Sequence, residues 1–458
     1  MVRDLERHRH AGASLRQGFP DRLRPWQRFA TNVVWNVVGA FFNQGSTLAL
    51  GLVVANTLGR DQYGIYGFLQ STMLLFMNIG QMAMGIVATK FVGEYHIREK
   101  ERAGRVIVLC LAFSAITATV AATTAFLLAP AIATTVFHTA SAANLIRLAA
   151  PAIFFAVITV PCSGILAGFG NFSKNAMAGV AAGITYFTIG AFMAVRFGLA
   201  AVIAGIGMSA CFQCALLLAL VFGEAKRQGV PVKWPSVRSI GAERRNLFHV
   251  AIPAALTGFS SLPAIWLANA ILARQPGGIA ALALFTAANS LRQVVLFAPY
   301  LIGNVGFSML SRHRGTADHE GFRHAFWMNV LASGAVAVAL AGAIIIGGHQ
   351  ILRVFGPAFA VAYPVLALLV ASTIPEALSV GLYQLIQSRG LIWISFFFIA
   401  LPRDCSLVAF AFFMSRRHGA FGLAEAFMIS ILVMLAWSLL LVRRLGIRPV
   451  AEPAAATA

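Results

Sequence analysis

The most constraining feature of this sequence is a series of long apolar runs. Residues 106–133 and 325–347, for example, contain no charged side chain, and each run is longer than the roughly 20 residues that a helix needs to cross a bilayer. The runs also lack the strict alternation that the strands of a membrane β-barrel require. Because a helix satisfies its own backbone hydrogen bonds in lipid, these runs predict an all-α polytopic membrane protein.

About twelve segments of this kind can be placed along the chain. The predicted transmembrane helices are residues 31–57, 65–89, 106–133, 145–167, 176–195, 199–222, 248–272, 280–310, 325–347, 364–386, 391–414 and 421–442. Composition supports this class, because 59% of the residues are hydrophobic and only 11% are charged, whereas a soluble domain is about 25% charged. A soluble globular protein is thereby excluded.

The distribution of the 35 Lys and Arg residues predicts the orientation of these helices. Most of them lie before the first span, in every second connection and after the last span, within residues 3–28, 90–105, 226–245, 312–323 and 443–448. The positive-inside rule places such segments in the cytoplasm, so we expect both termini on the cytoplasmic side of a bacterial inner membrane. The net charge of +20 then reflects topology and attraction to anionic membrane lipids, and requires no nucleic-acid partner.

The five cysteines all lie within predicted spans, outside the context of a disulfide framework. Cys211 and Cys214 form a CxxC motif, but no second cysteine or histidine pair accompanies them to complete a metal site. We therefore expect the cysteines to be packing residues, and we expect neither a metal nor a cofactor.

A repeated turn motif indicates that the chain consists of two related halves. Leu58, Arg60, Gly64 and Ile65 recur at a constant offset as Leu272, Arg274, Gly278 and Ile279. Because each half contains an even number of spans, the two halves have the same orientation and form a parallel 6+6 repeat. The predicted domains are a basic cytoplasmic tail (1–30), an N-terminal six-helix bundle (31–222), a basic cytoplasmic linker (223–247), a C-terminal six-helix bundle (248–442) and a cytoplasmic tail (443–458).

Two predicted spans carry polar residues at helical spacing. In the first span these are Asn32, Asn36, Asn43 and Ser46, and in the eighth span they are Thr286, Asn289, Gln293, Tyr300 and Asn304. Residues three or four positions apart share one face of a helix, and polar side chains in a membrane usually face protein or water. The stripes indicate an interior pathway, although hydrogen bonding between neighbouring helices would explain them as well.

Four charged residues fall near the middle of predicted spans in the second half: Arg292, Glu376, Arg403 and Asp404. Because an arginine at such a depth costs about 2.5 to 3.5 kcal/mol even on lenient insertion scales, these residues need partners, and Glu376 can serve either arginine. A buried ion-pair network that fixes helix packing, or one that couples transport to an ion, remains open for Glu376, Arg403 and Asp404. Arg292 shares its span with a polar stripe, and its planar fork suits the oxygens of a phosphate-bearing, anionic substrate.

The segment from Asn32 to Phe68 resembles the first hairpin of the polysaccharide flippases in the multidrug/oligosaccharidyl-lipid/polysaccharide superfamily. The resemblance is carried by the turn Leu58-Gly59-Arg60-Asp61, which is followed by Tyr63 and Gly64. The later segment 351–370 is similar to the connection that leads into the tenth span of that family.

The resemblance implies two six-helix bundles in a V, with spans one, two, seven and eight around a central cavity that faces alternate sides of the membrane. It also implies a substrate, a polyprenyl-diphosphate-linked oligosaccharide of O-antigen or exopolysaccharide type, which would be flipped across the inner membrane for surface polysaccharide biosynthesis. Arg292 and Asn289 would then contact the diphosphate, and Asn36, Asn43 and Gln293 would contact the sugars. Partners would be membrane lipids and the polymerase and glycosyltransferases of the same pathway.

One departure from the family concerns the end of span seven, where many members carry an acidic residue and this chain has Asn269. If that acid serves ion coupling, coupling here uses Glu376 or Asp404, or is absent. The first alternative function is a cation-coupled multidrug exporter of the same superfamily, whose organic cations favour acidic cavities. A membrane-embedded polysaccharide-assembly enzyme is a weaker alternative, because we find no catalytic motif and therefore do not expect an enzyme.

Overall fold

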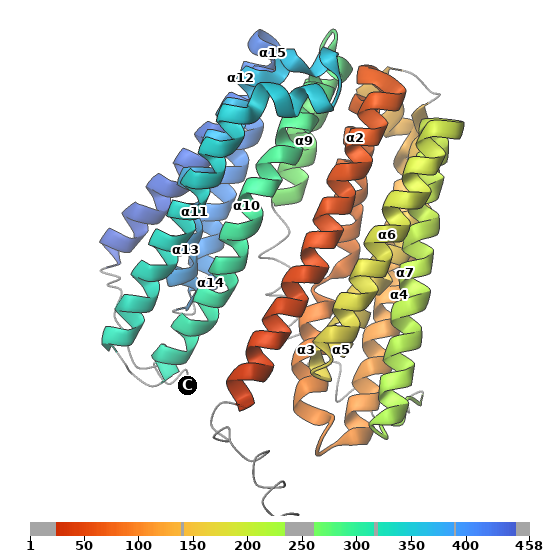
Figure 1. Cartoon of the computed structure of the whole chain (residues 1–458), viewed down its shortest axis with the longest axis vertical. Coiled ribbons are helices and arrows are strands. Elements are labelled where there is room, and N and C mark those ends of the chain that lie inside the picture. Colours follow the sequence, from red (N-terminus) through yellow and green to blue (C-terminus); the bar gives the residue numbers. More distant parts are fainter. Residues whose placement is uncertain (1–23, 139–141, 234–260, 316–318, 389–390, 446–458) are drawn as a thin grey trace, which may run out of the picture.

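The computed structural model describes residues 24–138, 142–233, 261–315, 319–388 and 391–445, and in this part of the chain every regular element is helical (Figure 1). This confirms the predicted all-α class. Most of the predicted tail 1–30, linker 223–247 and tail 443–458 lies outside the described residues. The exact domain limits therefore stay a prediction.

The helices follow the predicted spans closely. The first half contains α2 (Arg24–Gln81), α3 (Met84–Tyr95), α4 (Lys100–Ile132), the π-helical turn η2 (Ala133–Phe137), α5 (Ala142–Gly168), α6 (Phe172–Phe197) and α7 (Leu199–Arg227). The second half contains α9 (Ser261–Ala273), α10 (Gly278–Gly315), α11 (His319–Val354), the 3-10 turn η3 (Pro357–Ala362), α12 (Tyr363–Ala371), α13 (Thr373–Ser388), α14 (Ile392–Ser395), the π-helical turn η4 (Phe396–Ala400) and α15 (Leu401–Arg444).

Nine helical segments of the described residues are long and apolar enough to cross a membrane. Two of them, Val37–Gln81 with 45 residues and Trp393–Arg444 with 52 residues, are about twice as long as one crossing needs. Each contains a glycine with positive φ, Gly59 at 81° and Gly419 at 55°, where two helices meet. Together with the shorter apolar helix α9, the described residues are consistent with twelve spans.

The predicted span 65–89 is interrupted in the structure. Helix α2 ends at Gln81 and α3 begins at Met84, because Met82 and Ala83 have positive φ angles of 42° and 55°. Neither residue type favours this backbone region, so nothing in the local sequence predicts the break.

The helices form two groups that lie side by side in Figure 1. In one group α2 packs on α6, and α5 packs on α3, α4 and α7; in the other, α10 packs on α11, and α15 packs on α9 and α13. The first group is drawn in red to green and the second in green to blue (Figure 1). These groups correspond to the two predicted six-helix bundles, and we refer to them as the N-group and the C-group.

The two ends of the molecule differ in charge. The start of α2, the connection between α3 and α4, and the last turn of α7 with Lys226 and Arg227 lie at one end, the lower end in Figure 1. We refer to it as the basic end. Gly59, the turn between α9 and α10, and η3 lie at the other end, which we refer to as the opposite end (Figure 1).

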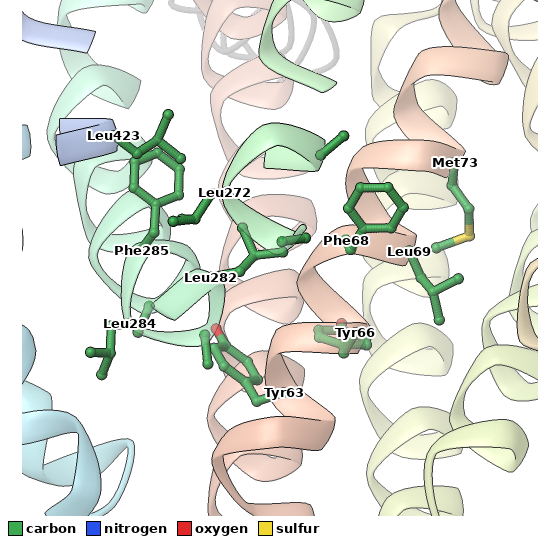
Figure 2. Packing of buried hydrophobic residues seen from close by; sticks show 14 of the residues in the cluster. Tyr63, Tyr66, Phe68, Leu69, Met73, Leu272, Leu282, Leu284, Phe285 and Leu423 are labelled. Atoms are coloured by element: carbon green, nitrogen blue, oxygen red, sulfur yellow. The ribbon is translucent and has the colours of Figure 1, made fainter. Parts of the chain in front are cut away.

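A buried seam joins the two groups toward the opposite end. One buried cluster contains Tyr63 and Phe68 of α2 together with Leu272 of α9 and Leu282 and Phe285 of α10, and Figure 2 shows these side chains among the helices. The ring of Tyr63 also lies 6.1 Å from that of Phe355 and 5.5 Å from that of Phe359. The N-group and the C-group are therefore packed tightly against each other here, as van der Waals contact between transmembrane helices requires.

Candidate functional site

A cavity of about 570 Å³ lies between the N-group and the C-group. Its walls come from both limbs of α2, on either side of Gly59, and from α9, α10 and α15. The polar lining residues are Asn43, Gln44, Thr47, Gln70, Ser71, Asn269, Thr286, Asn289, Ser290, Arg292 and Gln293. The helices are those expected for spans one, two, seven and eight, with an added contribution from Phe427 of α15.

Four of the five predicted substrate-binding residues lie together on these walls: Asn43, Asn289, Arg292 and Gln293. Their spacing explains this, since Thr286, Asn289 and Gln293 follow one face of α10. The side chains of Asn36 and Asn304 lie outside the described residues. Ser46 does not extend the stripe into the cavity, because its hydroxyl lies against Gly183 of α6.

Arg292 is 6% exposed and is paired within the C-group. Its Nη2 donates to Glu376 Oε2, its Nη1 lies 3.4 Å from Asn289 Oδ1, and its guanidinium lies 5.4 Å from the ring centre of Phe427. Tyr300 donates a 3.0 Å hydrogen bond to the other oxygen of Glu376. The Nε of Arg292 is buried and has no hydrogen-bond partner among the described residues, so one of its donors is still available.

Arg403 and Asp404 form a separate pair on α15. Arg403 Nε lies 2.8 Å and Nη2 lies 2.6 Å from Asp404 Oδ1, and Nη2 also donates to Ser261 of α9. Neighbouring residues are about 100° apart on a helix, so this pair was not required by the sequence; the long arginine side chain folds back to reach the carboxylate. Neither residue is among the described residues that line the cavity.

The two copies of the repeated turn meet at the opposite end. Arg60 Nε donates to the carbonyl oxygen of Ala280 over 3.0 Å, and Asn56 Nδ2 donates to the carbonyl oxygen of Val354 over 2.6 Å. Gly64 is packed so closely that a Cβ atom would overlap the carbonyl oxygen of Ile279. These contacts join the N-group and the C-group at the opposite end, and we refer to them as the gate. The sequence analysis identified Arg60 and Gly64 as repeat markers and as part of the family resemblance, and did not predict these contacts.

Trp266 of α9 is a further inter-group contact that the sequence analysis missed. Its Nε1 donates to Thr72 Oγ1 over 2.9 Å, and its ring centre lies 5.7 Å from that of Phe68. Thr72 is 2% exposed. Thr72 Oγ1 also donates to the carbonyl oxygen of Phe68 within α2, so its hydrogen-bonding need is met locally and the sequence carried no signal for this contact.

The charge of the cavity is distinctive. Among the described residues that line it, Arg292 is the only charged one, and the other polar groups are neutral amides and hydroxyls. Asn269, at the position where an acid was expected from the family resemblance, presents a buried Oδ1 with no partner among the described residues. Such walls can bind a ligand that is mostly neutral and hydrogen-bonding and carries a negative group.

The cysteines are all free. Cys110, Cys162 and Cys214 are buried packing residues, as expected, whereas Cys211 and Cys405 are exposed on the surface of the helices. The expectation of packing was therefore wrong for these two, because apolar spans also have faces directed away from the protein.

Residues 29–312 match the family described as polysaccharide biosynthesis protein. The chain is 24% identical over 80% of its length, and over 83% of the relative, to "EPS I polysaccharide export inner membrane protein EpsE" of Ralstonia nicotianae. A MATE family multidrug resistance transporter of the MOP superfamily, in an inward-facing conformation, matches with a TM-score of 0.74 and 16% identity, covering 91% of this chain and 99% of that one. The lipid II flippase MurJ matches with a TM-score of 0.69 and 14% identity over 90% of this chain and 87% of MurJ.

Proposed function

The chain belongs to the polysaccharide biosynthesis protein family, as its sequence indicated, and from this premise we propose that it is a flippase for polyprenyl-diphosphate-linked oligosaccharide. It would move this lipid by alternating access from the cytoplasmic to the outer leaflet of the inner membrane, for surface polysaccharide biosynthesis. The relatives are export and transport proteins, in agreement with the expectation that the chain is not an enzyme. Glycosyltransferases and a polymerase of the same pathway would supply and consume the substrate.

The observation that carries the proposal is that Arg292 is the single charged residue among the described residues of the cavity wall. Neutral amides such as Asn43 and Gln293 offer both donors and acceptors to sugar hydroxyls. Arg292 offers charge-assisted hydrogen bonds to diphosphate oxygens, and its Nε is unpaired among the described residues. An organic cation would find no carboxylate among the described lining residues, so the cavity favours the flippase over the multidrug exporter.

The orientation follows from the basic residues. If the basic end is cytoplasmic, both termini are cytoplasmic and the gate closes the outer end of the cavity. The cavity lies on the basic-end side of the gate, since it is lined by residues 40–48 and 67–74 of α2 whereas the gate involves residues 56–64. In this arrangement the substrate enters from the cytoplasmic leaflet, and release requires the bonds of Asn56 and Arg60 to break.

Substrate binding would displace Glu376 from Arg292. A diphosphate at Arg292 competes with the Glu376 carboxylate for the same guanidinium, because two anions so close together repel each other. The displaced Glu376 retains Tyr300 of α10 as its partner, while the next charged groups, Arg403 and Asp404 of α15, pair with each other. Arg403 and Asp404 would serve helix packing.

The test is complementation of a host that lacks its own oligosaccharide flippase but is supplied with the matching glycan pathway. Wild type should restore surface polymer, and Arg292→Ala should lose it while lipid-linked intermediate accumulates inside. The matched control is Arg417→Ala, which removes an exposed arginine of α15 and should leave export intact. Full activity of Arg292→Ala at equal membrane abundance would show that Arg292 is a packing residue. If wild type does not restore surface polymer, the result favours the multidrug exporter.

A further inference from the structure

A second pocket, of about 220 Å³, lies inside the N-group. It is lined by residues of α2, α5, α6 and α7, including Asn43, Ser163, Asn175 and Gln213. Ala40 and Asn43 line this pocket and the central cavity alike. The smaller pocket therefore adjoins the cavity at Ala40 and Asn43, and we refer to it as the side pocket.

Small residues make the room for the side pocket. A Cβ atom on Gly39 would lie 3.2 Å from the Cα atom of Ala176, and one on Gly179 would lie 3.7 Å from the Cα atom of Gly39. Helices α2 and α6 thus approach each other backbone to backbone, as small residues allow in membranes. Gly39, Ala176 and Gly179 have no large side chains, so the space beside this contact is not filled by them.

The polar groups of the side pocket are not used by the protein. The side chains of Asn43, Ser163, Asn175 and Gln213 contribute to the walls, and none of them makes a hydrogen bond to another described residue. Four helices thus direct three amides and one hydroxyl toward one small space. Asn43 is exposed and the other three side chains are half-buried, so their donors and acceptors are accessible to whatever occupies the pocket.

The chemistry of the lining points to a neutral ligand. Each amide provides two donors and an acceptor, and a hydroxyl provides one donor and two acceptor sites. No charged residue is among the described lining residues, so nothing selects an ion. Vicinal hydroxyls, which both donate and accept, match such a set. The volume equals that of about seven water molecules at about 30 Å³ each, which gives room for one sugar ring and not for a chain of them.

We propose that the side pocket binds a single sugar ring of the lipid-linked oligosaccharide while its diphosphate lies at Arg292 in the central cavity. The proposal rests on the flippase function. It makes Asn175 and Gln213 residues that determine which glycan is transported, because a site built to hydrogen-bond a hydroxyl rejects ligands that lack it. Asn43, shared by both spaces, would contact the sugar at the mouth of the pocket.

The test compares two probes on purified protein in lipid nanodiscs: the polyprenyl-diphosphate-linked oligosaccharide extracted from the producing strain, and the bare polyprenyl diphosphate. Wild type should bind the glycosylated lipid more tightly. Asn175→Leu and Gln213→Leu should each weaken its binding roughly tenfold, the loss expected for one hydrogen bond and its unpaired partner. Binding of the bare lipid should not change. Thr188→Val, an exposed position of α6, is the matched control and should bind both lipids like wild type.

The outcomes separate the two proposals. Equal losses for both lipids in Asn175→Leu and Gln213→Leu, or no loss for either, would overturn the sugar site and leave the flippase standing. Equal affinity of wild type for the two lipids would also overturn the sugar site and leave the flippase standing. Failure of wild type to bind either lipid would overturn the flippase as well. If the leucine variants do not fold, Ser163→Ala and Asn175→Ala, which only remove atoms, should still lower the preference for the glycosylated lipid several-fold.

Discussion

The guanidinium of Arg292 on α10 is paired with the carboxylate of Glu376 on α13, so the one charged group among the described cavity-lining residues is neutralised by a residue that does not line the cavity. Glu376 is held in turn by Tyr300, which lies two helical turns further along α10. The strength with which the wall attracts an anion therefore depends on a second helix of the C-group. This relationship makes Glu376 the first residue to test.

Glu376→Gln should tighten the binding of polyprenyl diphosphate, roughly tenfold, because the neutral amide no longer competes for Arg292. Titration of both proteins in nanodiscs with polyprenyl diphosphate measures this. The control is Glu425→Gln, which removes the partner of His418 away from the described cavity wall. Weaker binding to Glu376→Gln would instead mean that the pair fixes helix packing.

Gly64→Ala should prevent the gate from closing, because a Cβ atom has no room beside the carbonyl oxygen of Ile279. In a helix, alanine is otherwise about 1 kcal/mol more favourable than glycine, so any loss has to come from this contact. The control is Gly342→Ala, where nothing lies within 4 Å of the added atom. Complementation should fail with Gly64→Ala and succeed with Gly342→Ala at equal abundance. Normal export by Gly64→Ala would show that the contact is not needed for the transport cycle.

Asn56→Ala combined with Arg60→Ala should shift the protein away from the state with a closed gate. Each change removes a side-chain hydrogen bond from the N-group to a backbone carbonyl of the C-group, worth about 1 kcal/mol. A cysteine introduced at Gln70 on the cavity wall, in a background without the native cysteines, should then react several-fold faster with an impermeant maleimide added outside the cell. Arg274→Ala, at the equivalent position of the other repeat, should not have this effect. An unchanged labelling rate in the double variant would contradict the gate.

Much of the fold could be predicted because its determinants are local. The length and polarity of each run decide whether it spans the membrane, and the repeated motif around Arg60 and Arg274 reveals the two halves. Met82 and Ala83 could not be predicted as a break, because neither residue type favours the positive φ angles that they adopt.

The site was predictable only in part, for the same reason. Asn289, Arg292 and Gln293 could be assigned to one region from their spacing along α10, and Glu376 could be suggested as a partner because a membrane-embedded arginine needs an anion. The bond from Trp266 to Thr72 and the gate depend on which helix faces meet. Those are non-local relationships that a single sequence does not contain.

Lys174→Met should destabilise the N-group at its basic end. Glu224 is completely buried there and accepts hydrogen bonds from Lys174 at 2.6 Å, Arg227 at 3.0 Å and Gln228 at 2.8 Å. Removing one hydrogen bond to a buried charged group costs about 2 kcal/mol, so the midpoint of thermal unfolding in detergent should fall. Lys226→Met, an exposed lysine of α7, should leave the midpoint unchanged.

The double variant Lys174→Met with Glu224→Leu decides what the Lys174–Glu224 pair does. Replacing a buried ion pair by apolar residues is often neutral or stabilising, whereas breaking it strands a charge. The double variant should therefore be more stable than Lys174→Met alone and should retain export, because Glu224 and Lys174 lie among α6 and α7 and do not line the described part of the cavity. If stability is restored and export is nevertheless lost, the pair has a role in the transport cycle that packing does not explain.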